Sequence, residues 1–222
     1  MSRGPGFIIA IDGPSGAGKG TIARAVAHRL DYHHVDTGAM YRAVAWKALR
    51  EGIDLSDEEA TADVARRARI HVIDGAVSVD GEDIARAIRT PEIDAAAAAV
   101  ARLPKVRSIL IVQQREIGRD GGVVMEGRDI GTVVFPNADV KVYLDAAPGE
   151  RARRRANDPA HAAGRTGAAV EDVATALEAR DRSDRTRSTA PLMRAADAIE
   201  IDTTGVPVEE VIERVLALVN RK

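Results

Sequence analysis

The chain has 222 residues, of which 45% are hydrophobic and 30% charged, and 32 Lys+Arg against 34 Asp+Glu give a formal net charge of −2. This balance disfavours a nucleic-acid-binding module or another general polyanion binder. The absence of cysteine excludes disulfides, thiolate zinc sites and cysteine nucleophiles. No charge-free stretch approaches the ~20 apolar residues of a membrane span, and residues 1–7 lack the apolar region of a signal peptide. We therefore expect a single cytoplasmic unit, 1–222, with no membrane partner.

Strand patterns alternate with helical patterns along most of the chain. Residues 7–12 (FIIAID) are an unbroken apolar run, which is typical of a strand buried on both faces of a parallel sheet. Ile22, Val26 and Leu30 recur every four residues and predict a helix over about 19–30. Further strands are predicted at 33–36, 123–126, 140–145 and 199–202, with a closing helix at 208–219. The alternation predicts a doubly wound α/β fold with five parallel strands.

A glycine-rich segment joins the first strand to the first helix. It consists of Gly13, Pro14, Ser15, Gly16, Ala17, Gly18, Lys19, Gly20 and Thr21. The backbone N–H groups of such a loop, the helix N-terminus and the lysine together bind nucleotide phosphates. The segment departs from the pattern G-x-x-x-x-G-K-[ST] only at Gly20, which offers no hydroxyl to Mg²⁺. We therefore expect no protein ligand from position 20 and a metal held mainly by phosphates and water.

Polar segments follow the second and third predicted strands. Residues 36–42 (DTGAMYR) and 126–131 (EGRDIG) lie where open α/β sheets bind ligands, at the carboxyl ends of the strands. Arg42 is predicted to bind a second phosphate, although a solvated arginine after a helix cap at Asp36 or Thr37 is an equal alternative. In the second segment, flanking glycines favour a ligand site over an ordinary ion pair between Arg128 and Asp129.

A small antiparallel insertion is predicted between the second and third strands. From Ile70 to Ile84, two Asp-Gly pairs at 74–75 and 80–81 separate short β-branched runs, as in tight hairpins. Helices are expected after it, from Thr90 across the alanines 95–99, and from Pro104 to about Gly118.

Residues 148–187 are rich in arginine and predict two helices joined by a loop at 158–167. Arg151, Arg154 and Arg155 share a face of the first helix, and we expect no acidic partner nearby. Like charges repel unless an anion joins them, which favours a segment that closes over bound polyphosphate. Arg180, Asp184 and Arg187 share a face of the second helix. The alternative for that helix is surface pairing of Arg180 with Asp184 and of Asp181 with Arg185, worth only ~0.3–0.5 kcal/mol per pair.

Four motifs, in this order, resemble those of bacterial cytidylate kinases: FIIAIDGPSGAGKGT, DTGAMYR, EGRDIGTVVFP and RDRSDRTRSTAPL. The resemblance runs from Phe7 to the last helix. It implies an α/β fold of the P-loop kinase type, with the β insertion and a helical lid, and transfer of the γ-phosphate of ATP to CMP or dCMP with Mg²⁺. It also implies a core of residues 1–36, 105–150 and 188–222, a monophosphate-binding part at 37–104 and a lid at 151–187.

The resemblance implies a role for each matching residue. ATP is bound by the segment 13–21 and Arg154, and catalysis depends on Lys19, Arg128, Asp129 and Arg187. The CMP phosphate is held by Arg42, Arg128 and Arg187, the ribose by Arg180 and Asp184, and the base by Arg107 and Asp129, with Asp36, Thr37 and Tyr41 completing the CMP site. Where the family pattern has a serine that contacts cytosine, this chain has alanine, at Ala98 by our alignment.

Other functions remain as alternatives. A kinase that prefers UMP or another monophosphate is the closest of them. A GTPase switch would need an N-K-x-D motif, and the asparagines at 137, 157 and 220 are not followed by lysine. A nucleic-acid-binding module is opposed by the net charge. The five histidines lack metal-ligand spacing. We expect a monomer that binds small nucleotides.

Overall fold

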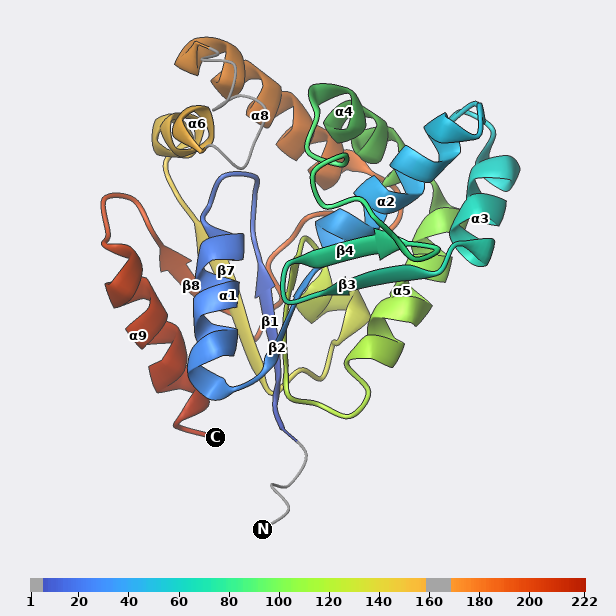
Figure 1. Cartoon of the computed structure of the whole chain (residues 1–222). Helices are drawn as coiled ribbons and strands as arrows, with labels where there is room; N and C mark the ends of the chain where they lie inside the picture. Colours follow the sequence, from blue (N-terminus) through green and yellow to red (C-terminus); the bar gives the residue numbers. More distant parts are fainter. Residues whose placement is uncertain (1–5, 159–168) are drawn as a thin grey trace.

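The computed structural model describes residues 6–158 and 169–222, and a five-stranded parallel sheet forms its centre (Figure 1). The strands lie in the order β2 (His33–Asp36), β6 (Val123–Gly127), β1 (Ile8–Asp12), β7 (Val140–Asp145) and β8 (Ile199–Asp202). Every neighbouring pair is parallel. The five predicted strands and the doubly wound order are confirmed, and β6 extends one residue further, to Gly127.

The register of the strands brings three acidic residues to one edge of the sheet. Asp36 pairs with Glu126 across β2 and β6, and Asp12 pairs with Gly127 across β1 and β6. All three acids therefore lie at or near the carboxyl ends of their strands, the edge at which open parallel sheets bind ligands.

Helices cover both faces of the sheet. The helices α1 (Lys19–Leu30) and α9 (Val208–Val219) pack on the face that includes Ile9 and Ile11 of β1. The other face, with Ala10, is covered by α5 (Pro104–Ile117) and the π-helix η1 (Ile130–Val134). Both faces of β1 are thus buried, which explains its unbroken apolar sequence. Among the helices of the described residues, none is long and apolar enough to cross a bilayer.

The segment after β2 forms a second core beside the sheet. It contains α2 (Thr37–Arg50), α3 (Glu58–Arg67), the antiparallel sheet β3 (Ile70–Ile73), β4 (Ala76–Val79) and β5 (Glu82–Asp83), and α4 (Pro91–Val100). Asp74 and Asp80 adopt positive φ angles of 51° and 54° before glycines that are also positive, as two-residue hairpin turns require. The predicted antiparallel insertion is confirmed.

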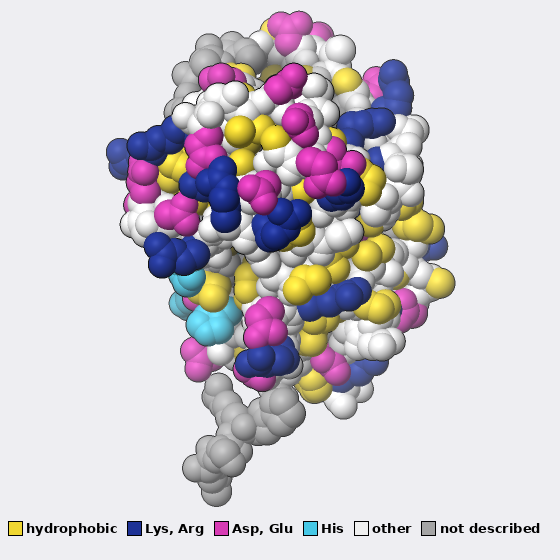
Figure 2. Space-filling view, turned by 90° about the vertical axis from the view of Figure 1, so that its right-hand side faces the viewer, with side chains coloured by type: hydrophobic (Ala, Val, Ile, Leu, Met, Phe, Trp, Pro, Cys, Tyr) yellow, Lys and Arg dark blue, Asp and Glu magenta, His cyan; other side chains and the backbone are white. Residues whose placement is uncertain are grey.

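Two further helices pack against each other above the carboxyl edge of the sheet (Figure 1). They are α6 (Pro148–Asn157) and α8 (Val170–Thr186), joined through a small apolar cluster of Ala152, Ala156, Val173 and Leu177. The two predicted helices are confirmed, whereas the loop predicted between them falls, after Asp158, outside the described residues. On the face seen in Figure 2, basic and acidic side chains are interspersed, which agrees with the near-zero net charge.

Candidate active site

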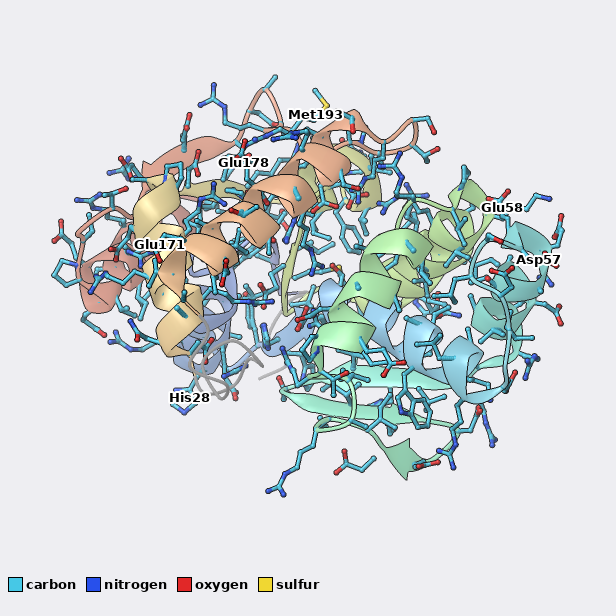
Figure 3. The ribbon with its side chains drawn as sticks, turned by 90° about the horizontal axis from the view of Figure 1, so that it is seen from above. His28, Asp57, Glu58, Glu171, Glu178 and Met193 are labelled. Atoms are coloured by element: carbon cyan, nitrogen blue, oxygen red, sulfur yellow. The ribbon has the colours of Figure 1, made fainter. Side chains whose placement is uncertain are left out.

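A cavity of about 740 Å³ opens between α6 and α8 on one side and α2 and α4 on the other (Figure 3). Among its described lining residues, eleven are Lys or Arg and six are Asp or Glu, although the whole chain is net negative. The cavity therefore concentrates positive charge, which suits polyanionic ligands.

The structure brings almost every predicted site residue to this cavity. Its lining includes Ser15, Gly16, Ala17, Gly18, Lys19, Gly20 and Thr21 of the P-loop, Arg154 of α6, and Asp36, Thr37, Tyr41, Arg42, Arg107, Arg128, Asp129, Arg180, Asp184 and Arg187. Gly13 and Pro14 do not line it. They connect β1 to the loop, and the carbonyl of Pro14 accepts a hydrogen bond from Nζ of Lys19 at 2.7 Å.

Lys19 is buried at the start of α1. Burial, reinforced by the positive charge of Arg128, lowers the pKa of Lys19 from 10.5 to about 7. An anionic ligand at the loop would favour the charged form and raise this pKa again. Lys19 is therefore poised to gain its full charge when phosphate binds.

The resemblance to cytidylate kinases implies that this loop binds ATP, and the lowered pKa then predicts a pH effect on ATP use. Because kcat/KM reports the free enzyme and kcat the complex, kcat/KM for ATP is expected to fall as the pH rises above about 7, while kcat falls only at higher pH. The folded state binds fewer protons than the unfolded state between the two Lys19 pKa values, so this group adds stability as the pH rises through that window. Steady-state kinetics from about pH 6 to 10, at fixed free Mg²⁺, measure the pH dependence of kcat/KM and of kcat. A kcat/KM profile that stays flat across this range would contradict the assignment, and Lys19→Arg, which keeps its charge, is the control.

Ser15 joins the P-loop to both helices above it. Its backbone N–H donates to Oδ1 of Asp181 at 3.0 Å, and its carbonyl accepts from Nη1 of Arg151 at 2.9 Å. Its hydroxyl accepts from Nη2 of Arg128 at 2.7 Å. Arg151 and Asp181 are themselves a buried ion pair. Gly16 also packs against Arg151. A Cβ at Gly16 would lie 2.9 Å from the Arg151 carbonyl oxygen, and the φ of +79° disfavours any side chain there.

The prediction that the arginines of α6 lack acidic partners is wrong. Arg151 pairs with Asp181, and Arg155 pairs with Asp94 of α4 at 3.3 Å. Arg154 pairs with Glu150, one turn earlier in the same helix, at 2.8 Å, and also donates to Thr203. Two of these acids come from other helices, so only the three-dimensional packing reveals them. The third, Glu150, stands at i−4 and was visible in the sequence.

The surface pairs considered for α8 are not those that form. Arg180 pairs with Asp94, with Nη1 3.9 Å from Oδ1, and Asp181 pairs with Arg151. Burial, together with the charge of Arg128, lowers the pKa of Arg180 to about 10. The pairing is therefore between helices, across the mouth of the cavity, and Arg180 faces other cations.

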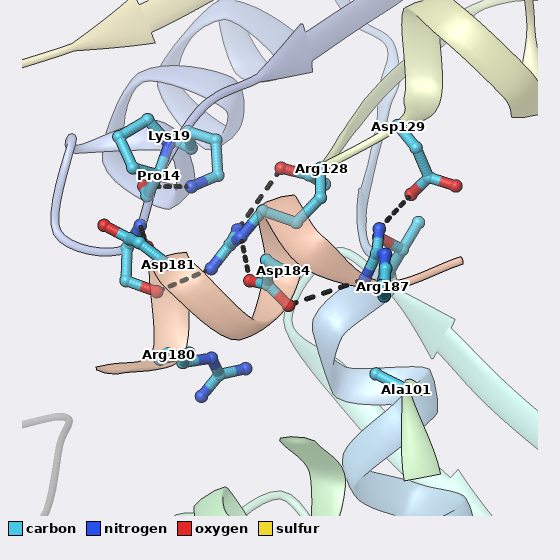
Figure 4. A network of polar contacts seen from close by, with 12 residues as sticks. Pro14, Lys19, Ala101, Arg128, Asp129, Arg180, Asp181, Asp184 and Arg187 are labelled. Atoms are coloured by element: carbon cyan, nitrogen blue, oxygen red, sulfur yellow. Dashed lines mark hydrogen bonds and ion pairs between the residues drawn. The ribbon is translucent and has the colours of Figure 1, made fainter. Parts of the chain in front are cut away.

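A chain of ion pairs forms the inner end of the cavity (Figure 4). Arg128 donates to Asp184 at 3.0 Å, and Arg187 lies 3.5 Å from both Asp184 and Asp129. Asp129 accepts from Nη2 of Arg107 at 2.5 Å. Alternating charges of this kind hold each guanidinium in place while leaving donors free to bind an anion.

Arg107 and Tyr41 form the floor below Asp129. Arg107 is 1% exposed, and its guanidinium carbon lies 5.3 Å from the centre of the Tyr41 ring. Ala97 and Ala101, at the end of α4, also line the cavity there, whereas Ala98 does not.

The helix start at α2 supplies another cation. Asp36 caps α2 by accepting from the backbone N–H of Ala39, and it also accepts from Nη2 of Arg42 at 2.8 Å. Burial alone would raise the pKa of Asp36, but Arg42 and Arg89 outweigh it and lower the pKa to about 2. The cap at Asp36 and a cavity-facing Arg42 thus occur together rather than as alternatives.

Two residues of this region were not singled out by the sequence analysis. Arg89 lines the cavity, and Asp12 supports it. Asp12 ends a strand at the binding edge, so its position gave a signal that could have found it. The contacts of Arg151 and Asp181 with Ser15 gave no such signal, because they arise only when α6 and α8 pack on the P-loop.

Comparison with known proteins agrees with this site. Residues 9–221 match the family model described as cytidylate kinase. The chain belongs to the cytidylate kinase family. It is 48% identical over 217 residues to a cytidylate kinase of Desulfitobacterium hafniense, a match that covers 96% of this chain and 93% of that protein. It is 46% identical over 215 residues to one of Solibacter usitatus, with 97% and 93% covered.

Similarity to solved structures concerns the fold alone. An uncharacterized protein from Eubacterium ventriosum has a TM-score of 0.57 at 10% identity, with 97% of this chain and 99% of that chain covered. Shikimate kinase from Bacteroides thetaiotaomicron has a TM-score of 0.50 at 13% identity, with 96% and 98% covered. This chain thus shares its α/β architecture with both proteins.

Proposed function

We infer that the protein transfers the γ-phosphoryl group of ATP to CMP or dCMP and releases ADP with CDP or dCDP. The observation that carries this conclusion is the cavity itself, which joins a P-loop lysine at one end to a cluster of buried arginines at the other. The family match over residues 9–221 identifies the acceptor as a cytidine monophosphate.

The P-loop end of the cavity holds ATP in this proposal. Backbone N–H groups of residues 13–21 and the N-terminus of α1 bind the phosphates, and Lys19 stabilises charge on the transferred group. Arg154, already fixed by Glu150 and Thr203 beside the loop, contacts the same nucleotide. Its two partners hold the guanidinium in one orientation before the ligand arrives.

The opposite end holds CMP. Arg42, Arg128 and Arg187 bind its phosphate, and the ribose lies against Arg180 and Asp184. Arg107 and Asp129 read the base, because the cytosine edge presents an amine that needs an acceptor and ring acceptors that need a donor. The pair is preorganised for this, with Asp129 bonded to Arg107 in the inner wall. Asp36, Thr37 and Tyr41 support the CMP site.

Catalysis follows from position and charge. Both substrates are anions, so in-line transfer needs close approach of two like-charged groups and little covalent help. Lys19 and Arg128 flank the space between the two ends, and Arg128 is itself anchored to the P-loop through Ser15. The helices α6 and α8 cover this space and exclude water, which would otherwise hydrolyse ATP.

Mg²⁺ is expected to accompany ATP, and the residues present fit it. Among the described residues there is no group of three or more His, Cys, Asp or Glu that would hold the ion alone. A Cβ at Gly20 would lie 3.0 Å from Oε1 of Glu126, so one carboxylate faces the start of α1. Mg²⁺ commonly combines one or two carboxylates with substrate phosphates and water. When bound, it neutralises phosphate charge.

The parts of the molecule divide the work in this proposal. Residues 1–36, 105–150 and 188–222 form the core, 37–104 the monophosphate-binding part and 151–187 the lid. Asp94 in α4 pairs with Arg155 and Arg180, and these contacts join the monophosphate-binding part to the lid. A monomeric state remains a prediction.

The proposal is tested by identifying the products. The protein is incubated with ATP, CMP and Mg²⁺, and nucleotides are separated by ion-exchange chromatography. We expect ADP and CDP in equal amounts, with both lost on addition of EDTA in excess of the metal. ADP formed without CDP would mean hydrolysis rather than transfer and would contradict the proposal.

A further inference from the structure

Asp12, the last residue of β1, makes two hydrogen bonds that the proposed mechanism does not use. Its Oδ1 accepts from the backbone N–H of Ile130 at 2.8 Å, and its Oδ2 accepts from that of Gly131 at 2.7 Å. The residue is 5% exposed. Both oxygens of one buried carboxylate therefore hold two consecutive amides of a segment 118 positions away.

These amides begin the π-helix η1, directly after Asp129. The N-cap residue of η1 is Asp129, whose own side chain makes no capping bond. Its carbonyl instead accepts from the amides of Val133 and Val134. The first N–H groups of a helix lack partners within it, so Asp12 supplies the cap from the neighbouring strand. Short π-helical turns are uncommon and frequently mark functional sites.

The cap bears on the residues that face the cavity. The Asp129 side chain points toward Arg107 and Arg187. The orientation of the turn at 128–131 therefore sets the position of its carboxylate. Asp12 fixes this turn against β1, the strand that leads into the P-loop. A small rotation of the turn would displace the Asp129 carboxylate from the cytosine amine while leaving the P-loop in place.

We propose that Asp12 is a positioning residue for base selection, which sets the Asp129 carboxylate through the start of η1 without touching substrate. The inference rests on the proposed function, because it presupposes that Asp129 reads the base. Burying a carboxylate is costly unless its hydrogen bonds are satisfied. Burial raises the pKa of Asp12 to about 6, although the hydrogen bonds from the two amides lower it. The carboxylate is therefore ionised at about pH 7.5 to 8.

Asp12→Asn tests this role with little change in shape. The amide group keeps one acceptor but turns a donor toward the second backbone N–H, so one bond is lost and replaced by repulsion. We expect the ratio of kcat/KM for CMP to that for UMP to fall about tenfold, while KM for ATP changes by less than about threefold. A merely structural role would lower the melting temperature without altering this ratio.

Asp139→Asn is the matched control. Asp139 accepts from the backbone N–H of Ile8 at 2.8 Å, at the opposite end of β1 and away from the cavity. Its replacement is expected to lower stability and leave the CMP to UMP ratio as in the wild type. If Asp12→Asn also leaves the ratio unchanged, the inference is overturned.

A second variant covers the case in which Asp12→Asn fails to fold. In Gly131→Ala, the new Cβ would lie 3.2 Å from Cδ of Lys141, a tight contact, and 3.4 Å from Oδ2 of Asp12, so it crowds the turn that Asp12 holds. We expect the same narrowing of the ratio, and an unchanged ratio would again overturn the inference. A wild-type protein with no preference for CMP over UMP would instead contradict the proposed function itself.

Discussion

Replacing Lys19 by methionine is expected to lower kcat by about three orders of magnitude, because in the proposed mechanism the side chain supplies charge where the transferred phosphoryl group passes. Methionine has a similar length and no charge. Since burial disfavours the charged form of Lys19 and lowers its pKa to about 7, the variant should be at least as stable as the wild type at or below neutral pH. Steady-state turnover and thermal unfolding of the same preparation measure both effects.

Lys141→Met provides the control for this experiment. The Lys141 side chain is 6% exposed, but it pairs with Asp197 and the carbonyl of Pro136, outside the cavity. Its loss should reduce stability and leave kcat close to the wild-type value. A folded Lys19→Met variant with near wild-type turnover would show that another group stabilises the transferred phosphoryl.

Asp129→Asn is expected to lower kcat/KM for CMP and to reduce the preference for CMP over UMP. In the proposed site the carboxylate accepts from the cytosine amine, whereas UMP would place a carbonyl oxygen there, and two facing acceptors repel. A buried group left unpaired costs about 1–3 kcal/mol, and more when it is charged. The asparagine amide can donate to the uracil oxygen, so the penalty for UMP falls.

The same change also removes a charge between two cations. Asp129 lies between Arg107 and Arg187, and neither guanidinium would then have its full counter-charge. The carboxylate also holds both guanidiniums in position, and the loss of this orientation should raise KM for CMP even apart from the base contact. The measurement is kcat/KM for CMP and for UMP, in the wild type and the variant, at saturating ATP. If the ratio of kcat/KM for CMP to that for UMP is unchanged, Asp129 does not recognise the base and only pairs with the arginines.

The main elements of the fold were predictable because their signals are local. The apolar run before the P-loop, the periodicity of α1 and the Asp-Gly hairpins depend on neighbouring residues only. Much of the cavity followed from one rule, that polar residues at the carboxyl ends of parallel strands meet at one edge. Arg42 and Arg128 reach the cavity for this reason.

What the sequence did not predict depends on contacts between distant segments. Arg155 pairs with Asp94 across 61 positions, and Asp12 caps η1 across 118. Helical spacing shows which side chains share a face, but not which acids a neighbouring helix brings to it. The arginines of α6 therefore suggested an unpaired cationic face, where the structure has three ion pairs that hold the guanidiniums in place.

The central claim is that the cavity is an ATP-dependent cytidylate phosphotransferase site, and the rate of ADP formation with different acceptors tests it most directly. The purified full chain is assayed with Mg²⁺ and ATP in a coupled assay, with CMP, dCMP, UMP or AMP as acceptor and with none. The structure predicts the highest kcat/KM for CMP or dCMP, a lower value for UMP and little ADP without an acceptor. Equal rates with all four acceptors, or a rate that does not depend on any acceptor, would contradict it.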